Sequence, residues 1–97
     1  MDEALSEVVI DACNRPYLVY NVKLPQERAG QFDLFLLREF FVALSSKAQI
    51  NLHAHCRYGE NAHHMVECLF KALGKAIKQA YTPRQGGQAA MSTKGSL

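Results

Sequence analysis

Residues 49–70, QINLHAHCRYGENAHHMVECLF, contain a change of hydrophobic period from two to about 3.6. Apolar and polar side chains alternate from residue 49 to residue 58, which predicts a strand with one face on a core and one polar face. Gly59 and Glu60 predict a turn, and Asn61 is a favoured N-cap for the helix that follows. The core face of the strand contains Ile50, Leu52, Ala54, Cys56 and Tyr58, and the polar face contains Asn51, His53, His55 and Arg57.

The helix after Asn61 is expected to continue to about Tyr81, because Thr82 and Pro83 then interrupt it. Its apolar residues recur at helical spacing, so one side should pack on the core. That expected apolar face contains Ala62, Val66, Leu69, Phe70, Leu73, Ala76, Ile77 and Ala80.

Two further strands are predicted before residue 24. Residues 7–13 (EVVIDAC) and 17–23 (YLVYNVK) are rich in β-branched residues, as strands are. Asn14, Arg15 and Pro16 separate them, and proline lacks the N–H that a strand ladder needs. We therefore expect the two strands to form a hairpin with a short turn.

A second helix is predicted before residue 49. Residues 24–31 (LPQERAGQ) read as a polar loop, with a short edge strand near Gln31 and Phe32. Asp33 is a favoured N-cap for a helix that ends near Lys47. The apolar stripe of this helix contains Leu37, Phe40, Phe41 and Leu44.

The predicted order of elements is β-β-α-β-α, which places the chain in the α/β class. The economical arrangement is an α+β two-layer sandwich, in which two helices cover one face of a small mixed sheet. Residues 1–97 then form a single domain. Residues 84–97 are Gly-rich and polar, so we expect a flexible C-terminal tail.

The composition fits one small domain of 97 residues with 48% hydrophobic residues and a formal net charge of +2. This low charge does not favour a dedicated nucleic-acid binder. No apolar run approaches the ~20 residues of a membrane-spanning helix. From the low charge we therefore expect no nucleic acid as a partner, and from the lack of such a run no membrane. The cysteines are odd in number, with no Cys-x-x-Cys pair, which favours a reducing compartment and a cytoplasmic location.

His63, His64 and Glu67 form the candidate site with the most chemical content. At 100° per residue they share an arc of the helix away from its apolar face. Glu67 follows His63 by four residues and His64 by three, so either imidazole can share an ion with it. The two adjacent rings diverge by about 100°, which suits two neighbouring metal ions better than one. Imidazole and carboxylate without thiolate favour manganese, iron or zinc.

Glu39 is a weaker candidate, because it lies opposite the apolar stripe of the earlier helix. Ordinary exposed side chains are an alternative interpretation of Glu39 and of the paired histidines. If both helices cover the same face of the sheet, their polar arcs point away from it. A site made from them would then open toward another helical layer, which implies a partner domain or subunit.

Ser92, Thr93 and Lys94 combine hydroxyls with an ammonium group, and Arg15 lies in a tight turn. Such groups can bind a phosphate, although the residues alone favour a flexible terminus for the first three. His53 and His55 are interpreted as exposed or interfacial residues of the strand.

Four segments together give the chain a resemblance to a known family. They are NRPYL at residues 14–18, NLH at 51–53, GENAHHMVECLF at 59–70 and STKG at 92–95. In this order they resemble imidazoleglycerol-phosphate dehydratase of histidine biosynthesis. The resemblance runs over residues 1–97 and corresponds to the second half of the family's length. It implies a ribosomal protein S5 domain 2-like half-domain, of which family members contain two copies.

The resemblance implies a hydro-lyase that dehydrates imidazole glycerol phosphate to imidazole acetol phosphate. It implies two Mn²⁺ ions per complete site, with His63, His64 and Glu67 as ligands and as catalytic residues. Glu39 would be a carboxylate ligand at a position where some members have histidine. His53 would have a supporting role. The residues expected to bind the substrate phosphate are Arg15, Ser92, Thr93 and Lys94.

The resemblance also implies two kinds of protein partner: the missing N-terminal half-domain and further copies in a large octahedral homo-oligomer. We therefore expect the chain alone to be nearly inactive. A non-catalytic metal-binding or structural half-domain is the alternative. A nucleic-acid-binding module is a weaker alternative. The low net charge favours a solvated helix face as the explanation of the basic residues Lys71, Lys75, Lys78 and Arg84.

Overall fold

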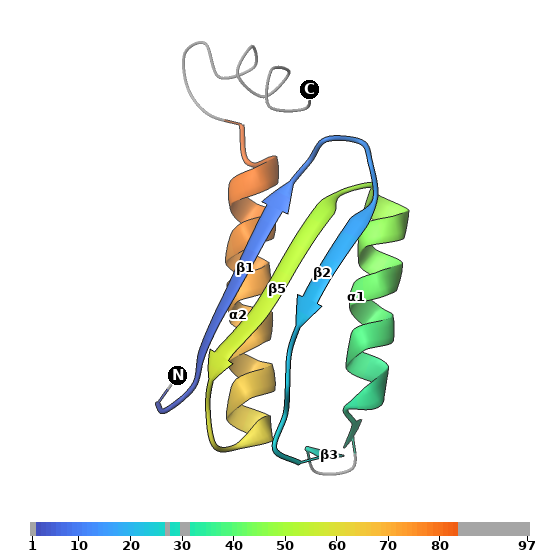
Figure 1. Ribbon diagram of the computed structural model, residues 1–97. Helices are drawn as coiled ribbons and strands as arrows, with labels where there is room; N and C mark the ends of the chain where they lie inside the picture. Colours follow the sequence, from blue (N-terminus) through green and yellow to red (C-terminus); the bar gives the residue numbers. More distant parts are fainter. Residues whose placement is uncertain (1, 27, 30–31, 84–97) are drawn as a thin grey trace.

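β5 (Asn51–Tyr58) is the central strand of the fold, and both of its edges are hydrogen-bonded. The computed structural model describes residues 2–26, 28–29 and 32–83. The three-stranded sheet has the order β1-β5-β2 (Figure 1), in which β1 (Leu5–Asp11) is antiparallel to β5 and β2 (Tyr17–Asn21) is parallel to it. The predicted alternation is confirmed, because Leu52 and Ala54 are fully buried and the intervening His53 is half-buried. Tyr58, at the strand's end, is exposed despite its expected place on the core face.

The predicted hairpin of the first two strands is wrong, since β5 lies between β1 and β2. Neighbouring strands lie about 4.8 Å apart, so the connection from β1 to β2 must cross roughly twice that distance. Residues 12–16 pass over the start of β5 (Figure 1), and Asn14 adopts a left-handed φ of 64° there. A two-residue hairpin turn could not make this crossing.

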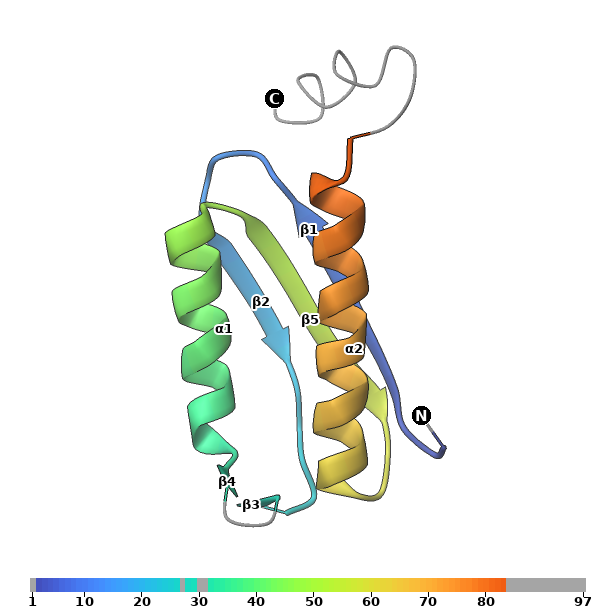
Figure 2. The ribbon, with the colours of Figure 1, turned by 180° about the vertical axis from the view of Figure 1, so that it is seen from behind.

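Both helices cover the same face of the sheet, as expected (Figure 2). α2 (Ala62–Tyr81) packs mainly on β1, and α1 (Phe35–Ala48) packs mainly on β2. The core therefore lies between one helical layer and one sheet layer. It consists of Leu37, Phe41, Ile50, Leu52, Ala54, Leu69 and Leu73.

The buried face of α2 is rotated from the predicted one by about 40°, at 100° per residue. Met65, which was not assigned to this face, is 3% exposed, whereas Phe70 is 38% exposed and Ile77 is 36% exposed. The turn before the helix explains the difference, because a Cβ atom on Gly59 would lie 2.5 Å from Met65 Cγ. The absence of a side chain at Gly59 lets Met65 pack against the turn. The buried residues of α2 are Ala62, Met65, Leu69, Leu73 and Ala76.

The predicted stripe of α1 holds at Leu37 and Phe41, which are fully buried, but Phe40 is exposed. Phe40 instead packs against Phe70 of α2, with ring centroids 5.5 Å apart. The two aromatic rings that we expected in the core thus form a contact between the helices.

The start of α1 lies slightly later than expected, since the helix begins at Phe35 with Leu34 at the N-cap position. The prediction of Asp33 as the N-cap is therefore wrong by one residue. Asp33 nevertheless contacts the helix end, because its Oδ1 atom accepts a hydrogen bond of 3.0 Å from the N–H of Phe35. Before the helix, β3 (Arg28–Ala29) and β4 (Phe32–Asp33) pair in a separate two-stranded sheet. The short strand predicted near Phe32 is therefore present, with a partner that was not anticipated.

None of the helices in the described part of the chain is long and apolar enough to cross a bilayer. Within the described residues, no disulfide involves Cys13, Cys56 or Cys68. The predicted tail at residues 84–97 lies outside the described residues.

Adjacent leucines in α1 test the assignment of the core. Leu37 is 0% exposed and Leu36 is 54% exposed. We expect Leu37→Ala to lower the free energy of unfolding by about 2–5 kcal/mol, because it leaves a cavity between α1 and the sheet. Leu36→Ala should cost less than about 1 kcal/mol, as exposed substitutions do. Urea unfolding followed by circular dichroism measures both, and equal losses would contradict this core.

Candidate functional site

The candidate site lies where the end of β5 turns into the N-terminus of α2. Asn61 has the extended backbone of an N-cap residue, and its side chain accepts a hydrogen bond of 3.1 Å from the N–H of His64. The predicted cap is therefore confirmed. Because the helix starts after Asn61, His63 and His64 lie in its first turn. The backbone N–H groups there have no partner within the helix itself.

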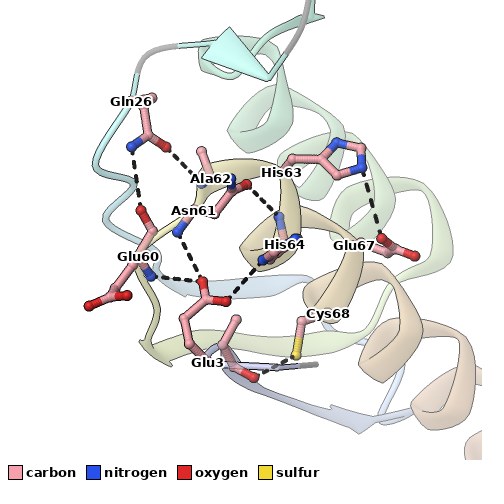
Figure 3. Close-up of polar contacts among 10 residues, drawn as sticks. Glu3, Gln26, Glu60, Asn61, Ala62, His63, His64, Glu67 and Cys68 are labelled. Atoms are coloured by element: carbon pink, nitrogen blue, oxygen red, sulfur yellow. Dashed lines mark hydrogen bonds and ion pairs between the residues drawn. The ribbon is translucent and has the colours of Figure 1, made fainter.

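Glu3, from the segment before β1, closes this end of the helix. Its Oε2 atom accepts hydrogen bonds from the N–H groups of Glu60 and Asn61, both at 2.9 Å. Its Oε1 atom lies 2.9 Å from Nδ1 of His64. Figure 3 shows the carboxylate between the backbone of the turn and the imidazole ring. One carboxylate thus satisfies two backbone donors and one side-chain donor.

Gln26, from the loop after β2, also binds the backbone at the N-terminus of α2. Its Oε1 atom accepts a hydrogen bond of 2.7 Å from the N–H of Ala62, and its Nε2 atom donates to the carbonyl of Glu60 at 3.4 Å. The N-terminus of α2 is therefore tied to two segments that are distant in sequence (Figure 3).

These contacts shift the protonation of both members of the ion pair. The N–H of Glu60, the His64 side chain and the N–H of Asn61 lower the pKa of Glu3 to about 2, since all three stabilise the ionised carboxylate. The hydrogen bond to Glu3 in turn raises the pKa of His64 above its ordinary value. A carboxylate at a helix N-terminus also interacts favourably with the helix dipole.

His63 and Glu67 form a second, more exposed pair on another side of α2 (Figure 3). His63 Nε2 and Glu67 Oε1 are 3.9 Å apart, which is too long for a hydrogen bond. The other oxygen of Glu67 lies 3.8 Å from Nζ of Lys71. The His63 side chain is 72% exposed, so the pair faces outward from the domain.

The two imidazole rings are held apart. The ring centroids of His63 and His64 are 6.4 Å apart, and the ring planes are inclined by 60°. His63 faces Glu67, and His64 faces Glu3. The arrangement therefore offers two separate donor positions, as the helical spacing predicted.

The donor set fits divalent cations, although the described residues do not form a complete site. Two ligands of one ion, each at about 2.0–2.2 Å, lie roughly 3–3.5 Å apart, so a small rotation would bring His63 and Glu67 to that separation. Within residues 2–26, 28–29 and 32–83, no three His, Cys, Asp or Glu side chains converge on one position. Glu39 lies exposed on α1 and joins no such group. Further ligands would have to come from elsewhere.

Arg15 lies at the opposite end of the sheet from the histidines. It precedes Tyr17, which pairs with Asn51 at the start of β5, whereas His63 follows the end of β5. The eight residues of β5 separate the two positions by roughly 25 Å, at about 3.3 Å per residue. One chain therefore does not bring Arg15 to its own imidazole pair. Ser92, Thr93 and Lys94 lie outside the described residues.

His53 and His55 are half-buried on the other face of β5, as the alternation predicted, away from the helices. Sequence analysis did not identify Glu3, Gln26 or Lys71 as site residues. Lys71 follows Glu67 by four residues, and that helical spacing could have indicated their contact. No local pattern connects Glu3 or Gln26 to α2.

A comparison with protein families matches residues 1–77 to the family described as imidazoleglycerol-phosphate dehydratase. The imidazoleglycerol-phosphate dehydratase of Halorhodospira halophila is 52% identical over 98 residues, which cover all of this chain and 50% of that protein. The enzyme of the same name from Geobacter sulfurreducens is 47% identical, with the same coverage. The chain thus spans about half the length of these curated relatives.

Solved structures agree with this match. The crystal structure of imidazoleglycerol-phosphate dehydratase from Staphylococcus aureus has a TM-score of 0.77 and 43% identity, over 79% of this chain and 45% of that one. The structure from Pyrococcus furiosus has a TM-score of 0.81 and 38% identity, over 100% of this chain and 53% of that one. The mixed sheet with two helices on one face is the fold of these proteins.

Acid should destabilise the chain through Glu3. The pKa of Glu3 in the folded state, about 2, is below its ordinary value of 4.5. Ionised Glu3 therefore stabilises the fold above about pH 4.5, and this stabilisation is lost as the pH falls toward 2. We expect Glu3→Gln to unfold at lower urea concentration than the unaltered chain at about pH 5, and the difference to shrink toward pH 2.

The matched control is Glu60→Gln, which removes a carboxylate from the same turn. The side chain of Glu60 forms no hydrogen bond or ion pair within the described part of the chain. Its substitution should leave the pH dependence of the urea midpoint unchanged. A difference between Glu3→Gln and the unaltered chain that stays constant with pH would contradict the assignment to Glu3.

Proposed function

We propose that this chain, which belongs to the imidazoleglycerol-phosphate dehydratase family, supplies one half of a dinuclear manganese site. The complete site would dehydrate imidazole glycerol phosphate to imidazole acetol phosphate in L-histidine biosynthesis. The observation that carries this proposal is the separation of the two imidazoles at the start of α2, each facing a different carboxylate.

Each imidazole would serve a different ion. His63 and Glu67 lie 3.9 Å apart and are outward-facing, so together they offer one ion two ligands. His64 would use its Nε2 atom for the other ion, because Nδ1 is occupied by Glu3. Glu39 is proposed as a further ligand, contributed from another copy or half-domain. Bound manganese would supply Lewis acidity toward the substrate imidazole and a template that orients it.

The residues of this chain would also position the substrate and its protons. The proton to be removed is not next to a carbonyl group, so the reaction depends on orientation and on electrostatic stabilisation of the ring. Glu67 would accept a proton, and Lys71, whose Nζ lies 3.8 Å from the second oxygen of Glu67, would stabilise the ionised carboxylate. A carboxylate that also binds a metal is a weaker base, so we assign Glu67 an assisting role.

The phosphate of the substrate would be bound by Arg15, Ser92, Thr93 and Lys94. Because Arg15 lies roughly 25 Å from the histidines of its own chain, this phosphate site would serve the metal site of another copy. The binding energy of the phosphate, remote from the reacting carbon, would orient the ring. The same separation supports a homo-oligomer, for which we propose an octahedral assembly that also includes an N-terminal half-domain of the family.

Reconstitution tests this function. The partner is the half of the Halorhodospira halophila relative that this chain does not match. We expect the chain alone to be nearly inactive, because its ligand set is incomplete, and the co-expressed pair to form imidazole acetol phosphate when manganese is present. Glu67→Gln should reduce this activity by more than about 100-fold, beyond the loss typical of residues that only orient a ligand.

Glu60→Gln is the control, since it makes the same chemical change outside the proposed ligand set and should retain activity. Metal analysis accompanies the assay. An oligomer that binds manganese but shows no response to the substrate, alone or with its partner half, would support the non-catalytic alternative. Full turnover by the chain alone would contradict the incomplete site.

A further inference from the structure

We propose that Glu3 is a positioning residue for His64, which fixes the imidazole in the tautomer protonated at Nδ1 and leaves Nε2 free to bind a divalent cation. This inference rests on the proposed function of α2 and adds to it a residue that lies outside the helix. It assigns Glu3 a role in metal binding in addition to its role at the helix N-terminus.

The first argument is the fixed position of the carboxylate. Glu60 and Asn61 donate their N–H groups to Oε2 of Glu3, both at 2.9 Å. These two bonds prevent the carboxylate from rotating away, so Oε1 stays directed at the His64 ring, 2.9 Å from Nδ1. The side chains of Glu3 and His64 are 28% and 35% exposed, which limits competition from water for this contact.

The second argument is the chemistry of the contact. An ionised carboxylate can only accept hydrogen bonds, so Nδ1 of His64 must carry the proton. In a neutral imidazole the other nitrogen, Nε2, is then the one with a free lone pair. A carboxylate on one nitrogen of a metal-binding histidine is the usual means by which proteins orient the ring and choose its tautomer.

The third argument is that the two oxygens of Glu3 have separable tasks. Oε2 accepts the backbone donors of the turn, which is a structural task, and Oε1 contacts His64. A residue that served only the helix end would not need the second contact. The contact of His63 with Glu67 is looser, because the two closest atoms lie 3.9 Å apart.

Glu3→Gln separates the two tasks. The backbone N–H groups require an acceptor, so the amide oxygen should take the place of Oε2 and the NH₂ group should face His64. An NH₂ donor requires Nδ1 to accept, which moves the ring proton to Nε2. The substitution is therefore expected to reverse the tautomer of His64 while keeping an acceptor at the end of α2.

Nitrogen NMR of the ¹⁵N-labelled, metal-free chain measures the tautomer, at about pH 9, which is well above the ordinary imidazole pKa of about 6.5. We expect the Nδ1-protonated form of His64 in the unaltered chain and the Nε2-protonated form in Glu3→Gln. His63 should be unchanged and provides the reference within each spectrum. Glu60→Gln should leave the tautomer of His64 as it is. An identical His64 tautomer in the unaltered chain and in Glu3→Gln would overturn the proposal.

Zinc titration of the same samples gives a second readout, because Zn²⁺ is diamagnetic and also binds imidazole and carboxylate ligands. In the unaltered chain bound zinc should shift the ¹⁵N resonance of Nε2 of His64 and that of a ring nitrogen of His63. In Glu3→Gln the zinc concentration needed to shift His64 should rise by about 10–100-fold, with His63 affected less. No shift of either histidine in the unaltered chain would overturn the proposed metal function. An unchanged zinc response of His64 in Glu3→Gln would instead overturn only the role of Glu3.

Discussion

The occupation of both edges of β5 is the constraint on which the rest of the structure depends. Because β1 and β2 pair with opposite edges, the connection between them must pass over the start of β5, and this places Arg15 there. The chain leaves the other end of β5 directly into the first turn of α2. The connection from β1 to β2 and the start of α2 lie at opposite ends of the domain (Figure 1). The arginine and the histidines are therefore kept apart.

The start of α2 is the second organised region, and its order comes from outside the helix. Two side chains from distant segments, Glu3 and Gln26, satisfy backbone N–H groups that the helix cannot satisfy itself. Glu3 also contacts the imidazole ring of His64. Stability at the end of the helix and the orientation of a candidate ligand are therefore linked through a single carboxylate, whereas His63 and Glu67 on the outer side are less constrained.

The sequence was informative where the determinants are local. The alternation in residues 51–58, the cap at Asn61 and the separation of the adjacent histidines all follow from short-range periodicity, and the structure confirms them. The hairpin was wrong because the choice between strand partners depends on a strand that comes later in the chain. The contact of Glu3 with His64 spans 61 positions and leaves no local pattern. The rotation of α2 depends on the packing of Met65 against the turn, which is likewise a tertiary effect.

The length of β5 has a genetic consequence if the substrate is bound as proposed. Each catalytic unit would combine the arginine of one copy with the imidazoles of another. No single copy would therefore need both an intact Arg15 and intact histidines. Two defective alleles, one altered at Arg15 and the other at His64, would then complement each other in a cell that expresses both. In oligomers that mix the two variants, some catalytic units would combine an intact Arg15 from one copy with an intact His64 from another.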